Sequence, residues 1–341
     1  MASRNSAADA PVRADLVLEG GGVKGIGLVG ALGPLTRAGY RFERIAGTSA
    51  GAIVGAVLAA LEQRGEPVTR LEDIARTLDY RKFRDRGFIG RRLGPLGFLV
   101  DGLSVLFELG AFEGDYLEEW LGGVLGDLGV ETFGDLVIDD PGGDGELHHR
   151  YRLMVTASDV SRRRLCLFPW HYPDYGLDPD EQRVVDAVRA SASVPYLFEP
   201  VQLKGSHGTS TLVDGGLISN YPIDAFDRSD RQPPRWPTIG VRLDALGIAP
   251  GEVEAAPVKD PVSMGIALIE TAIEGCQAKH VLDPCNVARS VYIDASALGS
   301  FDFSLSEAQQ EQLLEQGRLA AEEFLRGWDH ERWLRECRPA S

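Results

Sequence analysis

The apolar positions of the first 65 residues twice follow the same order: a short apolar strand, a glycine-rich turn and an apolar helix. Residues 15–19 read as a buried strand that leads into Gly20-Gly21-Gly22-Val23-Lys24-Gly25 and then into a helix ending near Ala38. A second strand near residues 44–46 leads into Gly47-Thr48-Ser49-Ala50-Gly51. The helix that follows is apolar all round, which is typical of the centre of a layered fold.

The rest of the chain alternates between strand and helix patterns. Strands are predicted at residues 151–157, 164–168, 212–213, 238–243 and 290–293, and helices at residues 71–80, 115–125, 184–192 and 304–326. The last helix opens on a capping-box pattern, Ser304 followed by Glu307. Strands that alternate with helices predict an α/β fold with a mostly parallel sheet that is covered on both faces.

The first helix carries three glycines at a spacing of three residues, Gly27, Gly30 and Gly33, followed directly by Pro34. Small residues at this spacing predict close packing against a neighbouring element. Pro34 lacks a backbone N–H, so it is expected to kink or shorten the helix. Gly39 is expected to stop the helix.

Composition narrows the range of partners and compartments. The 341 residues include 51 acidic and 35 Lys or Arg side chains, and the resulting net charge of −16 makes the chain a poor general binder of nucleic acid. The polar N-terminus does not look like a signal peptide, and the longest apolar stretch, residues 50–61, is too short to span a bilayer. We therefore expect a cytoplasmic protein, with signal-independent secretion left open.

The four cysteines are Cys166, Cys276, Cys285 and Cys337, and no two of them form a CxxC pair. This spacing does not fit a zinc site, so no metal is expected. Buried free thiols in a reducing compartment are the expected state.

Ser49 lies in a G-x-S-x-G pattern between a strand and a helix, flanked by Gly47 and Gly51. This context is that of a nucleophile elbow, a sharp turn that exposes a serine hydroxyl and leaves no room for neighbouring side chains. The positive end of the helix dipole also favours a developing alkoxide there. Ser49 is thus a candidate nucleophile, although the five residues alone are a weak signal.

The first glycine turn has three interpretations. Residues 20–25 match G-x-G-x-x-G, which binds a dinucleotide pyrophosphate when an acidic residue follows about 20 positions later. Glu43 is in range, but a second glycine turn follows at once, where a nucleotide-binding unit has none. The turn could instead supply backbone N–H groups to an oxyanion, or have no function. Three consecutive glycines followed by Lys24 suit an anion-accepting loop better.

The acid and base that would activate Ser49 are harder to assign. Asp214-Gly215-Gly216 follows a strand, but an Asp-Gly pair is usually just a turn. A triad in the order Ser, acid, His needs a histidine after the acid, and only His280 and His330 qualify. His280 lies in a predicted helix and His330 in a charged C-terminal stretch, rather than in glycine-rich loops after strands. These positions argue against a triad.

In this order, the three glycine motifs resemble the patatin-like phospholipase family, and residues 190–195 and 219–222 are similar to it as well. The resemblance implies a three-layer α/β/α fold with a mostly parallel central sheet and a helical insertion. It is strong over residues 15–225 and extends loosely through the final helix.

One acyl hydrolase domain is therefore expected at residues 15–328. Its helical insertion, at about 65–135, is a candidate lid. A disordered tail at residues 1–14 and a C-terminal tail at residues 329–341 are expected on either side of the domain.

The resemblance also implies residue roles. Ser49 is the expected nucleophile and Asp214 the expected general base, while Gly20, Gly21 and Gly22 form the expected oxyanion hole. The motif residues that would support this site are Lys24, Gly25, Gly47, Gly51, Gly215 and Gly216, with Pro195 and Asn220 in structural roles. Many members of the family have Asp-Gly-Ala where this chain has Asp-Gly-Gly.

These roles predict a lipid acyl hydrolase of phospholipase A type that forms an acyl-serine intermediate and uses no cofactor. The expected partner is a phospholipid or another acyl-ester lipid, and the oligomeric state is left open. Alternatives are an esterase with a Ser49, Asp214 and His280 triad, a nucleotide-binding protein that uses residues 20–25, and a regulated effector whose acyl-hydrolase parts are inactive.

The apolar segment at residues 93–112 has two interpretations, a core-facing helix or a lid that lines an acyl-chain groove. Basic residues precede or begin this region: Arg81, Lys82, Arg84, Arg86, Arg91 and Arg92. They are either a solvated face or a site of peripheral contact with anionic lipid at a membrane surface.

Overall fold

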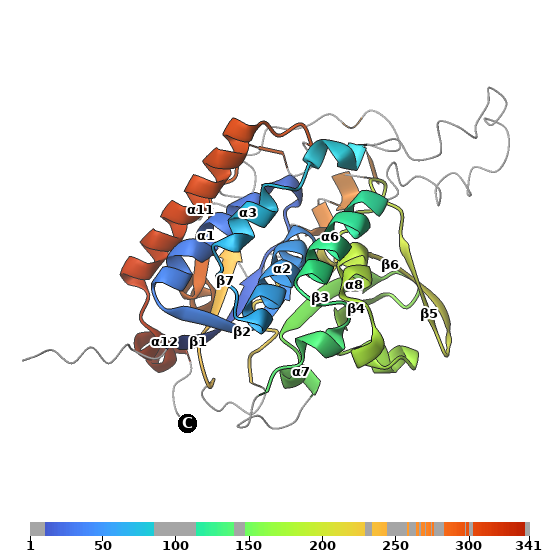
Figure 1. Cartoon of the computed structure of the whole chain (residues 1–341), viewed down its shortest axis with the longest axis horizontal. Coiled ribbons are helices and arrows are strands. Elements are labelled where there is room, and N and C mark those ends of the chain that lie inside the picture. The colour runs from blue at the N-terminus through green and yellow to red at the C-terminus, as the bar shows by residue number, and fades with distance from the viewer. Residues whose placement is uncertain are drawn as a thin grey trace, which may run out of the picture.

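The structure is a computed structural model (Figure 1) that describes residues 11–84, 114–139, 147–228, 234–243, 283–296 and 303–337, with isolated positions between 258 and 299. Its strands are β1 (Val12–Leu18), β2 (Tyr40–Gly47), β3 (Leu153–Asp159), β4 (Arg164–Phe168), β5 (Val201–Gly205), β6 (Gly208–Asp214), β7 (Thr238–Arg242) and β8 (Ser290–Tyr292). Its main helices are α1 (Ile26–Arg37), α2 (Ala50–Arg64), α3 (Arg70–Ala75), α6 (Asp115–Asp127), α7 (Leu147–Arg150), α8 (Val184–Ser191), α10 (Pro284–Ala288), α11 (Glu307–Gly327) and α12 (His330–Cys337). Short 3₁₀ helices include η1 (Gly22–Gly25), η2 (Tyr80–Arg84), η4 (Phe133–Leu136) and η7 (Gly215–Leu217).

The eight strands form one sheet in the order β5-β6-β3-β2-β1-β7-β8, with β4 paired to β3. Strands β3, β2, β1, β7 and β8 run parallel to one another, whereas the pairings of β3 with β4, β3 with β6 and β5 with β6 are antiparallel. The predicted mostly parallel sheet is confirmed. Because Leu18 pairs with Gly47, the carboxyl ends of β1 and β2 meet at one edge, and both glycine turns begin there.

The two faces of the sheet are covered by different parts of the chain. Figure 1 shows α1 and α2 across one face, with α11 alongside α1. Leu243, just after β7, lies on this face, 3.4 Å from where a Cβ of Gly27 in α1 would be. Because side chains alternate between the two faces along a strand, Gly240 of β7 and Leu243 point to opposite faces of the sheet. A Cβ at Gly240 would overlap the Tyr221 side chain, so Tyr221 covers the second face. The predicted α/β fold with both faces covered is confirmed.

Helix α1 packs closely on α11, as its glycines predict. A side chain at Gly30 would overlap the Leu314 carbonyl of α11, and one at Gly317 would overlap the Gly27 carbonyl of α1. The expectation that Pro34 shortens the helix is wrong, because α1 continues to Arg37. The missing Pro34 N–H removes a single hydrogen bond near the end of a helix whose inner face is held by packing.

The described parts of residues 65–135 contain helices α3, η2 and α6, as expected, although the predicted helix at 71–80 ends at Ala75 and η2 begins only at Tyr80. The segment at residues 93–112, together with Arg86, Arg91 and Arg92, lies outside the described residues. Strand β5 is not predicted by the sequence analysis. None of the helices in the described ranges combines the length and apolar character needed to cross a membrane.

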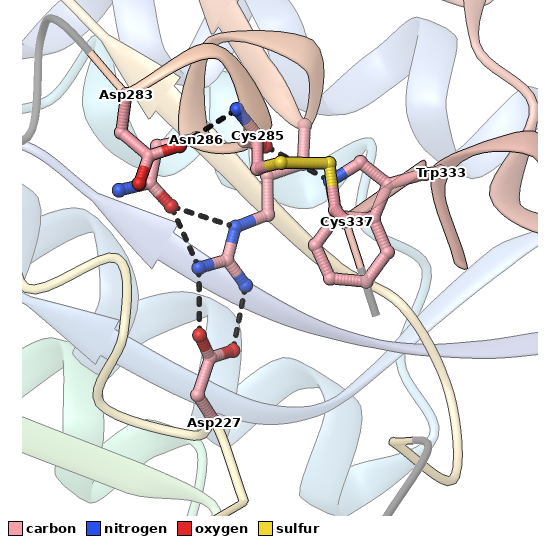
Figure 2. Close-up of a disulfide and its surroundings, with 7 residues drawn as sticks. Asp227, Asp283, Cys285, Asn286, Trp333 and Cys337 are labelled. Atoms are coloured by element: carbon pink, nitrogen blue, oxygen red, sulfur yellow. Dashed lines mark hydrogen bonds and ion pairs between the residues drawn. A yellow bond between two sulfur atoms is a disulfide. The ribbon is translucent and has the colours of Figure 1, made fainter. Parts of the chain in front are cut away.

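The C-terminal region differs from its prediction. Cys285 and Cys337 form a disulfide that joins α10 to α12, and Trp333 lies beside it (Figure 2). The expectation of free thiols is wrong for this pair, because the fold brings together two cysteines that are 52 residues apart. Cys166 is buried and free, as expected, and Cys276 lies outside the described residues.

Two helix boundaries also change. The region expected as a C-terminal tail contains α12 at residues 330–337. Helix α11 begins with a capping box between Ser306 and Gln309, two residues later than the predicted pair. Ser304 with Glu307 and Ser306 with Gln309 both fit the capping-box spacing, so the sequence pattern alone does not select between the two pairs.

Candidate active site

Ser49 occupies the turn between β2 and α2 in a conformation that residues other than glycine rarely adopt, with φ 52° and ψ −119°. Such a conformation costs about 1–3 kcal/mol and is typical of functional sites. Serine is a preferred helix N-cap, yet the Ser49 hydroxyl makes no capping hydrogen bond to α2. The hydroxyl is therefore available for chemistry at a helix N-terminus, where the helix dipole favours negative charge.

The glycines around Ser49 are required for space. A side chain at Gly47 would overlap the Gly51 carbonyl, and one at Gly51 would overlap the Leu18 carbonyl. A Cβ at Gly25 would lie 2.8 Å from the Ala50 Cβ. The first glycine turn, β1 and the start of α2 thus pack backbone against backbone at this edge of the sheet.

Asp214 comes to the same place from the end of β6. Strands β2 and β6 both pair with β3, which lies between them. On β3, the Thr156 hydroxyl hydrogen-bonds with the Thr48 hydroxyl at 2.7 Å, and a side chain at Gly215 would overlap that same Thr156 hydroxyl. Thr48, which precedes Ser49, and Gly215, which follows Asp214, therefore both contact Thr156.

The Asp214 carboxyl is buried, and none of the described residues places a counter-charge beside it. Its Oδ1 accepts a hydrogen bond from the Gly216 amide at 2.7 Å, whereas its Oδ2 is buried and has no hydrogen-bond partner among the described residues. Burial raises the pKa of Asp214 from 3.8 to about 7, and the nearby Ser49 hydroxyl and the Gly216 amide offset only part of this effect. Asp214 can therefore exchange a proton near neutral pH. The Ser49 hydroxyl is close enough to lower the pKa of Asp214, but no hydrogen bond joins the two side chains in this structure.

The first glycine turn borders Ser49 and is hydrogen-bonded to Asn220. A Cβ at Gly20 would lie 3.2 Å from the Ser49 Cβ. The Gly20 amide donates to the Asn220 carbonyl at 3.1 Å, and Asn220 Nδ2 donates to the Gly20 carbonyl at 3.0 Å. The Gly20 amide is thus already bonded, which narrows the candidate oxyanion donors to Gly21 and Gly22. These two residues open η1, where the first amides of a helix have no partner within the helix.

A buried ion pair fixes the base of this turn. Glu19 Oε1 accepts from Arg242 Nη2 at 3.0 Å, and Glu19 Oε2 accepts from the Leu243 amide at 2.7 Å. Lys24 belongs to the same turn. Hydrogen bonds from Ser296 lower the pKa of the Asp294 carboxyl, and the positive charge of Lys24 lowers it further. Neither Glu19 nor Arg242 is a candidate from the sequence, although a charged residue at the end of a buried strand is a usable signal.

An apolar cavity of about 80 Å³ opens beside Ser49 and Gly22. On α2 it is lined by Ala50, Ile53, Val54 and Val57, which share one helix face and lead away from Ser49 for about 12 Å at 1.5 Å per residue. Its other walls come from α1, α3, η2, α6 and the end of α8. The lining residues from residues 65–135 are Leu71, Ile74, Ala75, Leu78, Tyr80, Phe83, Leu117 and Trp120.

The histidines considered for a triad are not found near Ser49 among the described residues. His280 lies outside the described residues. His330 is in α12, next to Trp328, whose Nε1 donates to the Tyr40 hydroxyl at 3.0 Å. Tyr40 begins β2 and Ser49 follows its end, about 23 Å away along an extended strand. Within the described ranges, no group of three or more His, Cys, Asp or Glu side chains could hold a metal ion.

Comparison with known proteins decides the family. The sequence profile described as Patatin-like phospholipase matches residues 16–227. The chain belongs to the patatin-like phospholipase family. At the level of the family, this membership supports a lipid hydrolase.

Similar proteins agree with the patatin-like assignment. YqhO of Bacillus subtilis (strain 168) is 34% identical over 318 residues, which cover 93% of this chain and 99% of that protein. Lysophospholipase nte1 of Aspergillus niger is 28% identical over 215 residues, which cover 61% of this chain and only 11% of the fungal protein. The crystal structure of VipD from Legionella pneumophila has a TM-score of 0.50 at 17% identity, covering 93% of this chain and 67% of that chain, a likeness in fold alone.

Proposed function

We propose that this patatin-like protein hydrolyses acyl esters of lipids, with Ser49 as nucleophile and Asp214 as general base. The observation that carries the proposal is the buried Asp214 carboxyl. Its Oδ2 has no hydrogen-bond partner in the described residues, and the Ser49 hydroxyl, which does not cap its helix, is close enough to affect the pKa of the carboxyl. A buried carboxyl without a cation is costly for stability and is typical of groups that move protons.

In the proposed reaction, Ser49 Oγ attacks the ester carbonyl while Asp214 Oδ2 takes the hydroxyl proton. The Gly21 and Gly22 amides donate to the oxyanion that forms on the carbonyl oxygen. Asp214 then gives the proton to the departing alkoxide, which leaves as an alcohol, and the acyl group remains on Ser49. Water then attacks the acyl-serine carbonyl while Asp214 accepts a proton from the water. The bond from the acyl carbon to Ser49 Oγ breaks, Asp214 returns the proton to Ser49 Oγ, and the fatty acid leaves.

The cavity supports a lipid substrate. Its lining is apolar except for Ser49, Tyr80 and Trp120, which suits an acyl chain whose ester carbon is held at Ser49. The similar fungal protein is named as a lysophospholipase, which agrees with this substrate class. A nucleotide is disfavoured, because the first glycine turn opens on this apolar space and the Gly20 amide is already bonded.

The direct test combines active-site labelling with product analysis. A fluorophosphonate should label Ser49, identified by peptide mass spectrometry, and phosphatidylcholine or lysophosphatidylcholine vesicles should release free fatty acid. Ser49→Ala should abolish both signals. Fatty-acid release at the wild-type rate by folded Ser49→Ala protein would reject the proposal.

Peripheral contact with lipid is a further part of the proposal. Exposed Arg81 and Lys82 lie between Tyr80 and Phe83 in η2, and these two aromatic residues line the cavity, so positive charge lies beside the proposed acyl site. Replacing Arg81 and Lys82 by Gln should reduce flotation with vesicles that contain phosphatidylserine. Arg326→Gln, an exposed change on α11, is the matched control. Equal flotation of all variants would contradict this contact.

A further inference from the structure

One short segment at the end of α8 holds the backbones of both proposed dyad residues. The Ser49 amide donates to Ser191 Oγ at 2.9 Å. Two residues later, the Ser193 carbonyl accepts a hydrogen bond from the Asp214 amide at 2.8 Å. Ala192, between them, lines the apolar cavity. The segment thus contacts the nucleophile turn, the aspartate and the proposed acyl site.

The Ser191 hydroxyl is the side chain on which this arrangement depends. Ser191 is fully buried and the Ser49 amide is in the first turn of α2, where no helical carbonyl accepts from it. The amide belongs to the residue with φ 52°, so its acceptor restrains the strained turn directly. By contrast, the Ser193 hydroxyl is turned back to Arg189, accepting from its Nη1 at 2.5 Å and donating to its carbonyl at 2.7 Å.

We propose that Ser191 is a positioning residue for the acyl transfer, an inference that rests on the proposed function. Its hydroxyl accepts the Ser49 amide and so holds the backbone of the nucleophile in the one conformation that points Ser49 Oγ toward Asp214 and the cavity. Because the Ser49 amide donates to Ser191, that amide does not serve the oxyanion. Ser191 touches neither substrate nor reacting atoms, so its loss changes the rate of the chemical step more than substrate binding.

Four variants separate a hydrogen-bond acceptor from simple packing. Ser191→Ala removes the acceptor, Ser191→Cys keeps a similar shape with a weak acceptor, and Ser191→Thr keeps the hydroxyl. Ser290→Ala is the matched control, since Ser290 is also buried and its hydroxyl donates to the Asn286 carbonyl at 2.6 Å. Ser290 begins β8, at the edge of the sheet opposite Ser49.

The measurements are kcat and KM for a short p-nitrophenyl ester, the rate constant of fluorophosphonate inactivation, and Tm. Ser191→Ala and Ser191→Cys should each lower kcat and the inactivation rate by about 10- to 100-fold, as expected for a misplaced reacting group. KM should change by less than about threefold. Ser191→Thr should retain most of the wild-type kcat, and Ser290→Ala should lower Tm while keeping kcat.

The outcomes distinguish this inference from the proposed function. If Ser49→Ala and Asp214→Asn are inactive while folded Ser191→Ala or Ser191→Cys keeps wild-type kcat, the positioning role fails and the dyad stands. If Ser191→Ala loses activity only through KM or through its folded fraction, the positioning role also fails. If Ser49→Ala keeps wild-type activity, the proposed function itself fails.

Discussion

Two buried aspartates of the same sheet have opposite surroundings. Asp15 of β1 accepts two hydrogen bonds from the Arg44 guanidinium, at 2.9 and 2.5 Å. Asp214 of β6 instead has two neutral groups that lower its pKa, the Gly216 amide, which donates to Oδ1, and the nearby Ser49 hydroxyl. Burial raises the pKa of both carboxyls, but only at Asp15 does a guanidinium charge oppose that effect. The paired aspartate holds strands together, whereas the unpaired one is suited to accept a proton.

The same contrast separates the two edges of the sheet. Beyond the carboxyl ends of β1 and β2, the Ser49 backbone is strained, and the buried Asp214 Oδ2 has no hydrogen-bond partner in the part of the chain that the structure describes. At the opposite edge, Asp227 forms two hydrogen bonds with Arg289, at 2.6 and 2.9 Å, close to the disulfide (Figure 2). Local strain and unsatisfied polar groups are tolerated where function uses them.

The largest expected effect is on activity at the unpaired aspartate. Asp214→Asn should lower kcat by about 10²–10⁴-fold, because the amide cannot accept the Ser49 proton. Initial rates on a short-chain ester measure kcat. The comparison variant is Asp15→Glu, which retains a carboxylate beside Arg44. Turnover by Asp214→Asn within about threefold of wild type would contradict the role of Asp214 as base.

The paired aspartate should matter for stability. Asp15→Asn leaves the buried Arg44 guanidinium without its anion and should lower the free energy of unfolding by about 3–5 kcal/mol. Urea unfolding followed by circular dichroism measures this change. Glu66→Gln is the control, since it weakens an exposed ion pair with Arg70 and should cost about 1 kcal/mol or less. Equal losses for the two variants would show that burial does not distinguish these pairs.

The unpaired aspartate should show the reverse effect on stability. With a pKa of 3.8 when unfolded and about 7 when folded, Asp214 binds more proton in the native state, so its contribution to stability falls as pH rises from about 4 to 7. Asp214→Asn has no such loss and should be more stable than wild type above pH 7, by roughly 4 kcal/mol at most. Below pH 4 the two should agree. Denaturation series at pH 4 and pH 8 test this, and a variant less stable at pH 8 contradicts it.

The smallest expected effect concerns the disulfide at the edge opposite Ser49. Replacing both Cys285 and Cys337 by Ser should reduce the free energy of unfolding by about 2–4 kcal/mol. Because the bond lies far from Ser49, kcat at 25 °C should stay at the wild-type value. Thermal unfolding with and without dithiothreitol compares the same bond in the wild-type chain. A loss of kcat in fully folded double variant would show that the two edges are coupled.

Much of this architecture could be predicted from local pattern. The strand, glycine turn and helix at Ser49 are encoded within one continuous stretch, residues 40–64, and the sheet type follows from the alternation of strands and helices. The approach of Asp214 to Ser49 is different, because it depends on β6 pairing antiparallel to β3 across the sheet. From the residues alone Asp214 is predicted only as a turn residue, and its role comes from the family resemblance.

Long-range contacts account for what the sequence did not predict. The acceptor role of Ser191, the bonding of the Gly20 amide to Asn220 and the disulfide all join residues that are at least 52 positions apart. The face of α2 that lines the cavity is as apolar as the faces that pack in the core, so composition cannot separate them. Such features are set by tertiary packing rather than by local propensity.

The most direct measurement is the pH dependence of the rate at which a fluorophosphonate modifies Ser49, compared between wild type and Asp214→Asn. The wild-type rate should rise with pH around a midpoint near 7, set by ionisation of the buried carboxyl, and the Asp214→Asn rate should be low and flat across that range. If Asp214→Asn reacted quickly with the same midpoint, another group, such as an imidazole, would be the base, and the Ser49–Asp214 dyad would be rejected.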